Sequence, residues 1–99
     1  MDLHLKDHSA VIVGGASGIG LASAECFAAE GVKVAIWDNA ANTEQVAEAI
    51  SIQFQVRSVG VSVDVTDAQS IMEAIPKTTE SLGPINHLVH GAAIRTLPT

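Results

Sequence analysis

Aromatic residues are scarce in this sequence, whose 99 residues include one Trp, two Phe and no Tyr. A hydrophobic core must therefore come from aliphatic side chains, which suits the buried strands of a parallel sheet. Cysteine is rarer still, because Cys26 is the only one. A single cysteine excludes an internal disulfide and indicates a reducing, cytoplasmic location. We expect Cys26 to be a small buried side chain.

Positive charge is also scarce, since five Lys and Arg face eleven Asp and Glu, for a net charge of −6. The basic residues are scattered along the chain, which disfavours nucleic acid and anionic membranes as partners, because both require clustered cations. No segment approaches the roughly 18 apolar residues of a membrane span. The first ten residues lack the apolar segment of a secretory signal.

The histidines give no pattern that predicts a metal site. His87 and His90 are three residues apart in an expected strand, so their side chains should point to opposite faces of the sheet. His4 and His8 lie in a segment without helical periodicity. We therefore expect no bound metal.

Short β-branched runs alternate with amphipathic stretches along the whole chain. This alternation predicts an α/β fold, a doubly wound parallel sheet of the Rossmann type in which the helices cover both faces. The order of the strands across such a sheet is 3-2-1-4. We expect residues 1–99 to form the N-terminal part of a single domain of this kind. The expected strands are 10–13, 32–37, 57–63 and 87–91, and the expected helices are 19–30, 43–54 and 66 to about 83.

Several residues mark the ends of the expected helices. Gly31 is placed for a left-handed C-terminal residue. Asn42 or Thr43 is a candidate cap for the second helix. Thr66 and Gln69 have the spacing of a capping box. Pro76 lies within the third helix, so we expect a bend or two short helices there.

A glycine-rich turn joins the first strand to the first helix, from Val13 to Gly20. The start of a helix offers unpaired N–H groups and the positive end of a dipole, so a pyrophosphate can bind there. Glycine allows the backbone to turn tightly and to approach the phosphates closely. The candidate phosphate-binding residues are Gly14, Ser17, Gly18, Ile19 and Gly20.

An acidic residue, Asp38, ends the second strand 18 residues after Gly20. A carboxylate at about this distance accepts hydrogen bonds from the ribose hydroxyls of a dinucleotide. The same carboxylate would repel a 2′-phosphate, and the adjacent Asn39 carries no positive charge. The sequence therefore favours NAD over NADP. The alternative is that Asp38 is a solvated acid in a turn.

The three motif glycines, Gly14, Gly18 and Gly20, fit G-x-x-x-G-x-G rather than the commoner G-x-G-x-x-G. This spacing resembles the T-G-x-x-x-G-x-G signature of the short-chain dehydrogenase/reductase family, with Val13 in place of the threonine. Asp64 and Val65 match the acidic residue and its neighbour that, in this family, contact the adenine. The alternative role for Asp64 is to help begin the following helix.

A second segment, Leu88 to Ile94, resembles the family's L-V-N-N-A-G-I. The usual N-N-A-G is His90-Gly91-Ala92-Ala93 in this sequence. The resemblance implies that His90, Gly91 and Ala92 line the adenine and ribose side of the cofactor. In the family the motif threonine supports this segment by hydrogen bonding, which Val13 cannot do.

The resemblance implies an NAD-dependent oxidoreductase that transfers hydride between the cofactor and an alcohol or carbonyl substrate. It covers about Leu5 to Ile94, less than half of a family member. The family's catalytic serine, tyrosine and lysine come later, and this sequence has no Tyr. We therefore expect no catalytic residue in these 99 residues, a cofactor-binding role for them, and a homo-oligomer for the complete enzyme.

Three other interpretations remain open at this stage. The chain could be a non-catalytic NAD-binding module, or an inactive truncated product that binds nothing. A Rossmann-like methyltransferase is a weaker rival, because the glycine spacing and the Asp64-Val65 match speak against it. If strand four is an uncovered sheet edge, its apolar residues also predict self-association of the isolated chain.

Overall fold

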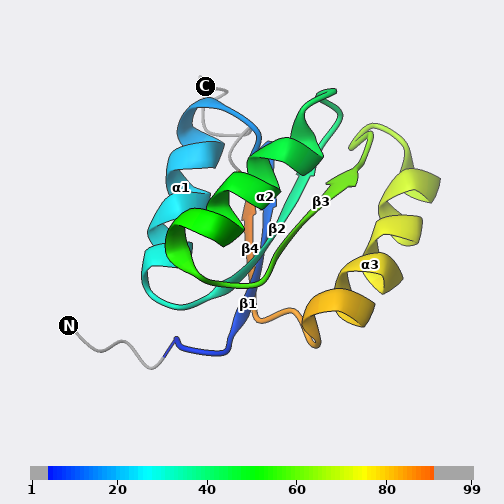
Figure 1. The fold of residues 1–99 in the computed structure, drawn as a ribbon. Coiled ribbons are helices and arrows are strands. Elements are labelled where there is room, and N and C mark those ends of the chain that lie inside the picture. The colour runs from blue at the N-terminus through cyan, green and yellow to red at the C-terminus, as the bar shows by residue number, and fades with distance from the viewer. Residues whose placement is uncertain (1–4, 91–99) are drawn as a thin grey trace, which may run out of the picture.

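The computed structural model describes residues 5–90, in which strands and helices alternate (Figure 1). All strand pairs are parallel, and the sheet has the order β3-β2-β1-β4. This confirms the predicted doubly wound fold and its strand order. The elements in chain order are β1 (Ser9–Val13), α1 (Gly18–Ala29), β2 (Lys33–Asp38), α2 (Thr43–Phe54), β3 (Ser58–Ser62), α3 (Ala68–Leu82) and β4 (His87–His90).

The register of the sheet brings the carboxyl ends of its strands to one edge. Val13, the last residue of β1, pairs with Trp37 of β2 and with His90 of β4. On the far side of β2, Asp38 pairs with Ser62 of β3. The loops that follow these strands therefore begin close together, which is where ligands bind in open α/β sheets.

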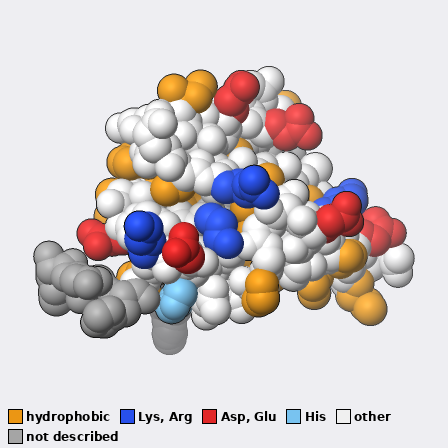
Figure 2. All heavy atoms as spheres, turned by 60° about the horizontal axis from the view of Figure 1, so that its bottom comes forward, with side chains coloured by type: hydrophobic (Ala, Val, Ile, Leu, Met, Phe, Trp, Pro, Cys, Tyr) orange, Lys and Arg blue, Asp and Glu red, His pale blue; other side chains and the backbone are white. Residues whose placement is uncertain are grey.

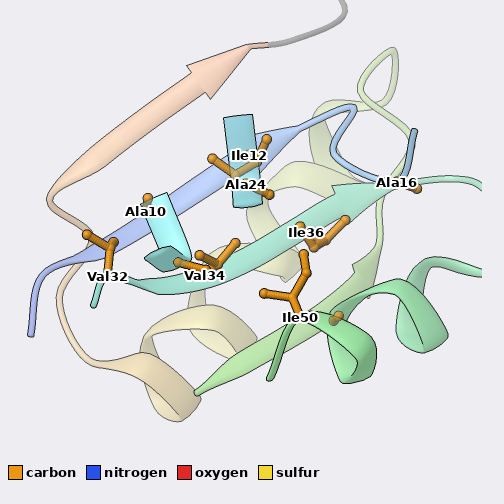
Figure 3. Packing of buried hydrophobic residues seen from close by; sticks show 10 residues of the cluster. Ala10, Ile12, Ala16, Ala24, Val32, Val34, Ile36 and Ile50 are labelled. Atoms are coloured by element: carbon orange, nitrogen blue, oxygen red, sulfur yellow. The ribbon is translucent and has the colours of Figure 1, made fainter. Parts of the chain in front are cut away.

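One face of the sheet is covered by α1 and α2 (Figure 1). Figure 3 shows Ile12, Val34 and Ile36 of the strands packed with Ala24 of α1 and Ile50 of α2. Strands that carry Val, Ile and Ala on both faces are typical of a sheet buried between helices. The aliphatic core expected from the shortage of aromatic residues is confirmed.

The other face is covered by α3, and the single tryptophan lies there. Trp37 packs with Val11, Val13 and Leu82 in a second core cluster. Its indole Nε1–H donates to Thr78 Oγ1 at 2.9 Å, and the Thr78 hydroxyl donates to the carbonyl oxygen of Ala74 at 2.9 Å. Thr78 is fully buried, so this chain of hydrogen bonds satisfies the only polar atom of the tryptophan side chain.

The strand β4 lies at the edge of the sheet and, within residues 5–90, pairs with β1 alone. Leu88 pairs in register with Val11, which places it on the α3 side of the sheet. Because α3 covers β2 and β3 instead, Leu88 is 68% exposed. The expected apolar edge is thus present, and self-association through it stays a prediction.

The start of α3 differs from the expected capping box. The helix begins at Ala68, and its cap is Asp67, whose carboxylate accepts a hydrogen bond from the Gln69 N–H at 3.0 Å. The Thr66 hydroxyl instead donates to Asp64. The Thr66–Gln69 prediction was therefore wrong, because a carboxylate one residue later provides the cap. At α2 the cap residue is Asn42, without a side-chain cap bond.

Pro76 does not divide α3, which runs unbroken from Ala68 to Leu82. The expectation of two short helices was therefore wrong, and the alternative expectation of a bend within one helix stays a prediction. Pro76 and Met72 are both exposed, whereas the buried face of the helix is formed by Ala74, Thr78 and Leu82. The carbonyl that loses its partner to proline therefore lies on the solvent side, where water can satisfy it.

Cys26 is exposed on α1, so its expected burial was wrong. The side of α1 that contacts the sheet is instead formed by Gly20, Ala24 and Ala28. No helix within residues 5–90 combines the length and apolar character needed to cross a bilayer.

The basic residues are less scattered in the structure than in the sequence. Lys6, Lys33 and Arg57 line one pocket, because each lies at or just before the start of one of three neighbouring strands. Figure 2 looks toward this end of the molecule and shows lysine and arginine side chains gathered there. Arg57 donates to the carbonyl oxygen of Ser81 at 3.0 Å, near the C-terminus of α3. Cations at this place balance the negative ends of the helix dipoles.

The buried bond between Trp37 and Thr78 leads to a stability prediction. Thr78→Val removes the hydroxyl and leaves the indole N–H without its partner, so it should lower the free energy of unfolding by about 1–3 kcal/mol. Urea unfolding measures the loss. Thr79→Val is the matched control, because the Thr79 hydroxyl bonds Pro76 on the exposed side; it should cost less than about 0.5 kcal/mol. Equal losses would contradict the assigned role of Thr78.

Candidate functional site

The glycine turn leaves β1 at the carboxyl edge of the sheet. The Gly14 N–H donates to the carbonyl oxygen of Trp37 at 2.8 Å, which fixes the first residue of the turn against β2. Gly14 has φ 75° and Gly18 has φ 59°. Both angles are in the left-handed region, where residues with a Cβ are strained. Two of the three motif glycines are therefore required by the path of the backbone.

The third motif glycine, Gly20, is required by close packing. A Cβ built there would collide with the carbonyl oxygen of Gly14 and lie 2.7 Å from its carbonyl carbon. It would also lie 3.0 Å from the Gly15 Cα. The first turn of α1 therefore rests directly on the start of the glycine turn.

The start of α1 is open to solvent. Its cap, Ser17, makes no side-chain capping bond, and the first turn contains no acidic residue. Ser17, Gly18 and Ile19 are all exposed. The first N–H groups of a helix have no partner within the helix, so this end provides donors and a positive dipole end for an anion.

The carboxylate of Asp38 ties the glycine turn to the end of β2. Its Oδ2 accepts a hydrogen bond from the Ala16 N–H at 3.0 Å, and its Oδ1 accepts one from the Ala40 N–H at 3.1 Å. A carboxylate offers about four acceptor positions, so each oxygen can accept a further hydrogen bond. From the sequence, Asp38 was expected either to bind a ligand or to be a solvated acid in a turn, and neither expectation included the support that it gives to the glycine turn.

Asp64 and Val65 follow β3 and are both exposed. The Thr66 hydroxyl donates to Asp64 Oδ1 at 2.6 Å, and the Thr66 N–H donates to the same oxygen at 2.9 Å. These two hydrogen bonds hold the pKa of the Asp64 carboxyl below its ordinary value, and the bond from the Thr66 hydroxyl has the larger effect. Asp64 is therefore an ionised acceptor at neutral pH.

A pocket of about 310 Å³ joins these segments at the carboxyl edge. It is lined by Gly14 of the turn, Asp38 at the end of β2, and Asp64 and Val65 after β3. The structure thus brings together residues from three loops that are up to about fifty positions apart in sequence. The other lining residues are Val13, Trp37, Asn39, Val63 and Thr66.

Of the three candidates from the segment that starts at Leu88, one lies on β4 beside this pocket. His90 is exposed and pairs in register with Val13, the residue before the turn. Gly91 and Ala92 lie outside the described residues. Across residues 5–90 no group of three or more His, Cys, Asp or Glu side chains is placed to share a metal ion.

Comparison with known proteins places this turn and pocket in a family. A family model described as short chain dehydrogenase matches residues 8–99. The chain belongs to the short-chain dehydrogenase family. The alternative of a Rossmann-like methyltransferase is thereby set aside.

Two curated short-chain dehydrogenases illustrate the similarity. The chain is 38% identical over 90 residues to a probable NADP-dependent mannitol dehydrogenase of Yarrowia lipolytica, covering 91% of this chain and 32% of the relative. It is 38% identical over 87 residues to an L-2,3-butanediol dehydrogenase of Corynebacterium glutamicum. This match covers 86% of this chain and 34% of the relative. The chain therefore spans about a third of the length of the curated relatives it matches.

A solved short-chain dehydrogenase structure has the same architecture. The L-sorbose reductase of Gluconobacter frateurii, complexed with NADPH and L-sorbose, superposes with a TM-score of 0.85 at 31% sequence identity. The match covers 100% of this chain and 36% of the reductase. The fold of this chain is thus similar to that of about a third of the reductase.

The glycines of the turn lead to a paired prediction. Gly20→Ala places a methyl group against the backbone of Gly14, which cannot move aside as a side chain can, so it should cost about 3 kcal/mol of stability. Gly18→Ala meets no atom within 4 Å and should cost only the left-handed strain of about 1–2 kcal/mol. Urea unfolding of both variants measures the difference. A larger loss for Gly18→Ala would contradict the packing described for Gly20.

Proposed function

We propose that this chain binds the adenosine half of NAD and supplies the cofactor-binding part of an oxidoreductase. The observation that carries the proposal is the position of Asp38. It is the last residue of β2, it is bonded to the glycine turn, and it lines the same pocket as Asp64 and Val65. A single carboxylate therefore stands between the candidate phosphate site and the candidate adenine site.

The pyrophosphate would bind at the start of α1. Ser17, Gly18 and Ile19 are exposed there, and no acid in the first turn competes with an anion. The open space beside Gly18 supports this placement, because a Cβ built on that residue meets nothing within 4 Å. The backbone N–H groups would hold the phosphates without a basic side chain, which agrees with a net charge of −6.

The adenosine ribose would bind to Asp38, whose oxygens each have acceptor capacity left. A 2′-phosphate would meet this carboxylate, and among residues 5–90 no Lys or Arg lines the pocket to offset the repulsion. We therefore propose a preference for NAD. Relatives whose names specify NADP or NADPH, such as the mannitol dehydrogenase and the sorbose reductase, support a nicotinamide dinucleotide as the cofactor class.

The adenine would lie between the loops that follow β3 and β4. Asp64 would accept a hydrogen bond from the exocyclic amine, and Val65 would contact the ring. His90, Gly91 and Ala92 would line the opposite side. The ionised state of Asp64, maintained by Thr66, supports its role as an acceptor.

The reaction we propose is hydride transfer between nicotinamide and an alcohol or carbonyl substrate. The names of similar proteins include a mannitol dehydrogenase, a butanediol dehydrogenase and a sorbose reductase, which supports an alcohol/carbonyl pair as the substrate class. The residues described in this chain would orient the cofactor and take no part in proton transfer. A cytoplasmic, homo-oligomeric enzyme is the setting we propose for this domain.

Cofactor preference gives the direct test of the role of Asp38. The double variant Asp38→Ala/Asn39→Arg removes the carboxylate and adds a cation for the 2′-phosphate, so it should shift preference toward NADP by about 1–3 kcal/mol. Calorimetric titration with each cofactor gives the ratio of the two affinities. The ratio of the two affinities reports cofactor preference alone, because loss of the hydrogen bond from the Ala16 N–H should weaken the binding of NAD and of NADP to the same extent.

Glu48→Gln provides a control, because it removes an exposed carboxylate of α2 outside the pocket. It should leave the ratio of affinities unchanged. Equal affinities of the unmodified chain for NAD and NADP would contradict the proposed preference. If the double variant still preferred NAD, Asp38 would not be the residue that determines the preference for NAD over NADP.

A further inference from the structure

Two histidines that are 79 positions apart meet at the amino ends of the strands. The Nδ1 of His8 lies 3.0 Å from the Nε2 of His87, and the ring centroids are 5.2 Å apart. His8 comes directly before β1, and His87 is the first residue of β4, the neighbour of β1 in the sheet. The contact therefore follows from the strand order, which is why the spacing of histidines in the sequence did not predict it.

Both histidines are held in place by contacts with the protein and are partly exposed to solvent. The backbone of His8 is fixed by two hydrogen bonds, from its N–H to the Leu5 carbonyl and from the Lys33 N–H to its own carbonyl, each 2.9 Å long. The ring of Phe27, from α1, packs against His87 with centroids 5.7 Å apart. Both histidines are half-buried, so the contact lies at the surface of the molecule and not in its core.

We propose that His8 and His87 form a two-histidine site for a divalent transition metal of the zinc, nickel and copper class, with water at the remaining positions. Imidazole nitrogens are preferred ligands of these ions. At a metal–nitrogen distance of 2.0–2.1 Å, two tetrahedral ligands are about 3.3 Å apart. The observed separation of 3.0 Å needs to widen by a few tenths of an ångström, and each ring must also turn so that its lone pair points at the ion rather than along the line between the two nitrogens.

The protonation of the rings is compatible with this change. In the contact between the two nitrogens, one ring donates its N–H and the other accepts. To bind a metal, the donating ring moves its proton to its other nitrogen, so that both facing nitrogens present lone pairs. No net proton is lost when both rings are neutral, and the ion replaces the shared hydrogen between them.

The site is distinct from the cofactor pocket, because it lies at the opposite ends of β1 and β4. A bound ion would connect the segment before β1 to the edge strand β4. Since such an ion binds the folded chain, it should raise the thermal stability. No third His, Cys, Asp or Glu side chain in residues 5–90 completes the site, so we expect rapidly exchanging binding rather than a permanently held ion.

Titration with zinc chloride in a buffer that does not chelate metals tests the site. Calorimetry should show saturable binding of one zinc ion, weakened at least tenfold by His8→Gln and by His87→Gln. His90→Gln is the matched control, because His90 is an exposed histidine of the same strand that should leave zinc affinity unchanged. Circular dichroism checks the fold of each variant.

A second measurement does not depend on the variants. Paramagnetic Ni²⁺ added to the unmodified chain should broaden the NMR signals of the His8 and His87 rings before that of His90. Preferential broadening of His90, no saturable zinc binding by the folded chain, or zinc binding retained in both single variants would each overturn the proposal. Because none of these readouts involves NAD, failure here is independent of the cofactor-binding proposal.

Discussion

The Asp38 carboxylate holds the glycine turn against the end of β2, and the candidate site depends on that contact. It bonds the N–H of Ala16 in the turn and of Ala40 after the strand. Without it, the glycine turn would lose its hydrogen bond to a side chain of the second strand. The same group lines the pocket that reaches Asp64. Structural support of the turn and the proposed recognition of the ligand therefore rest on one side chain, so a change there should affect both.

The small residues of α1 make this arrangement possible. Gly20, Ala24 and Ala28 form the buried side of the helix, and the helix starts in contact with the turn. A larger side chain at the first of these positions would push the helix N-terminus away from β1. The close approach of the helix and the aliphatic sheet thus determines where the free N–H groups of Ser17 and its neighbours lie. The geometry of the candidate anion site is a consequence of core packing.

The features that sequence reasoning predicted are those with local causes. β-branched runs, the alternation of elements and the glycine spacing gave the fold, the strand order and the position of the turn. Features that depend on distant parts of the chain were missed. The exposure of Pro76 to solvent, the exposure of Cys26 and the meeting of His8 with His87 are set by which elements pack together. Thr66 was a plausible cap in sequence, and only the folded loop shows that Asp67 takes that role.

We propose that the adenosine half of NAD binds at the carboxyl edge of this sheet. This proposal can be tested by titrating NAD into the ¹⁵N-labelled chain and following the backbone amide signals by NMR. Binding at this edge should give saturable shifts in the glycine turn from Gly14 to Gly20, at Asp38 and Ala40, and at Asp64 and Val65. Amides at the amino edge, such as those of Lys33 and Arg57, should stay in place. Shifts confined to the amino edge, or no saturable shifts in a folded chain, would contradict it.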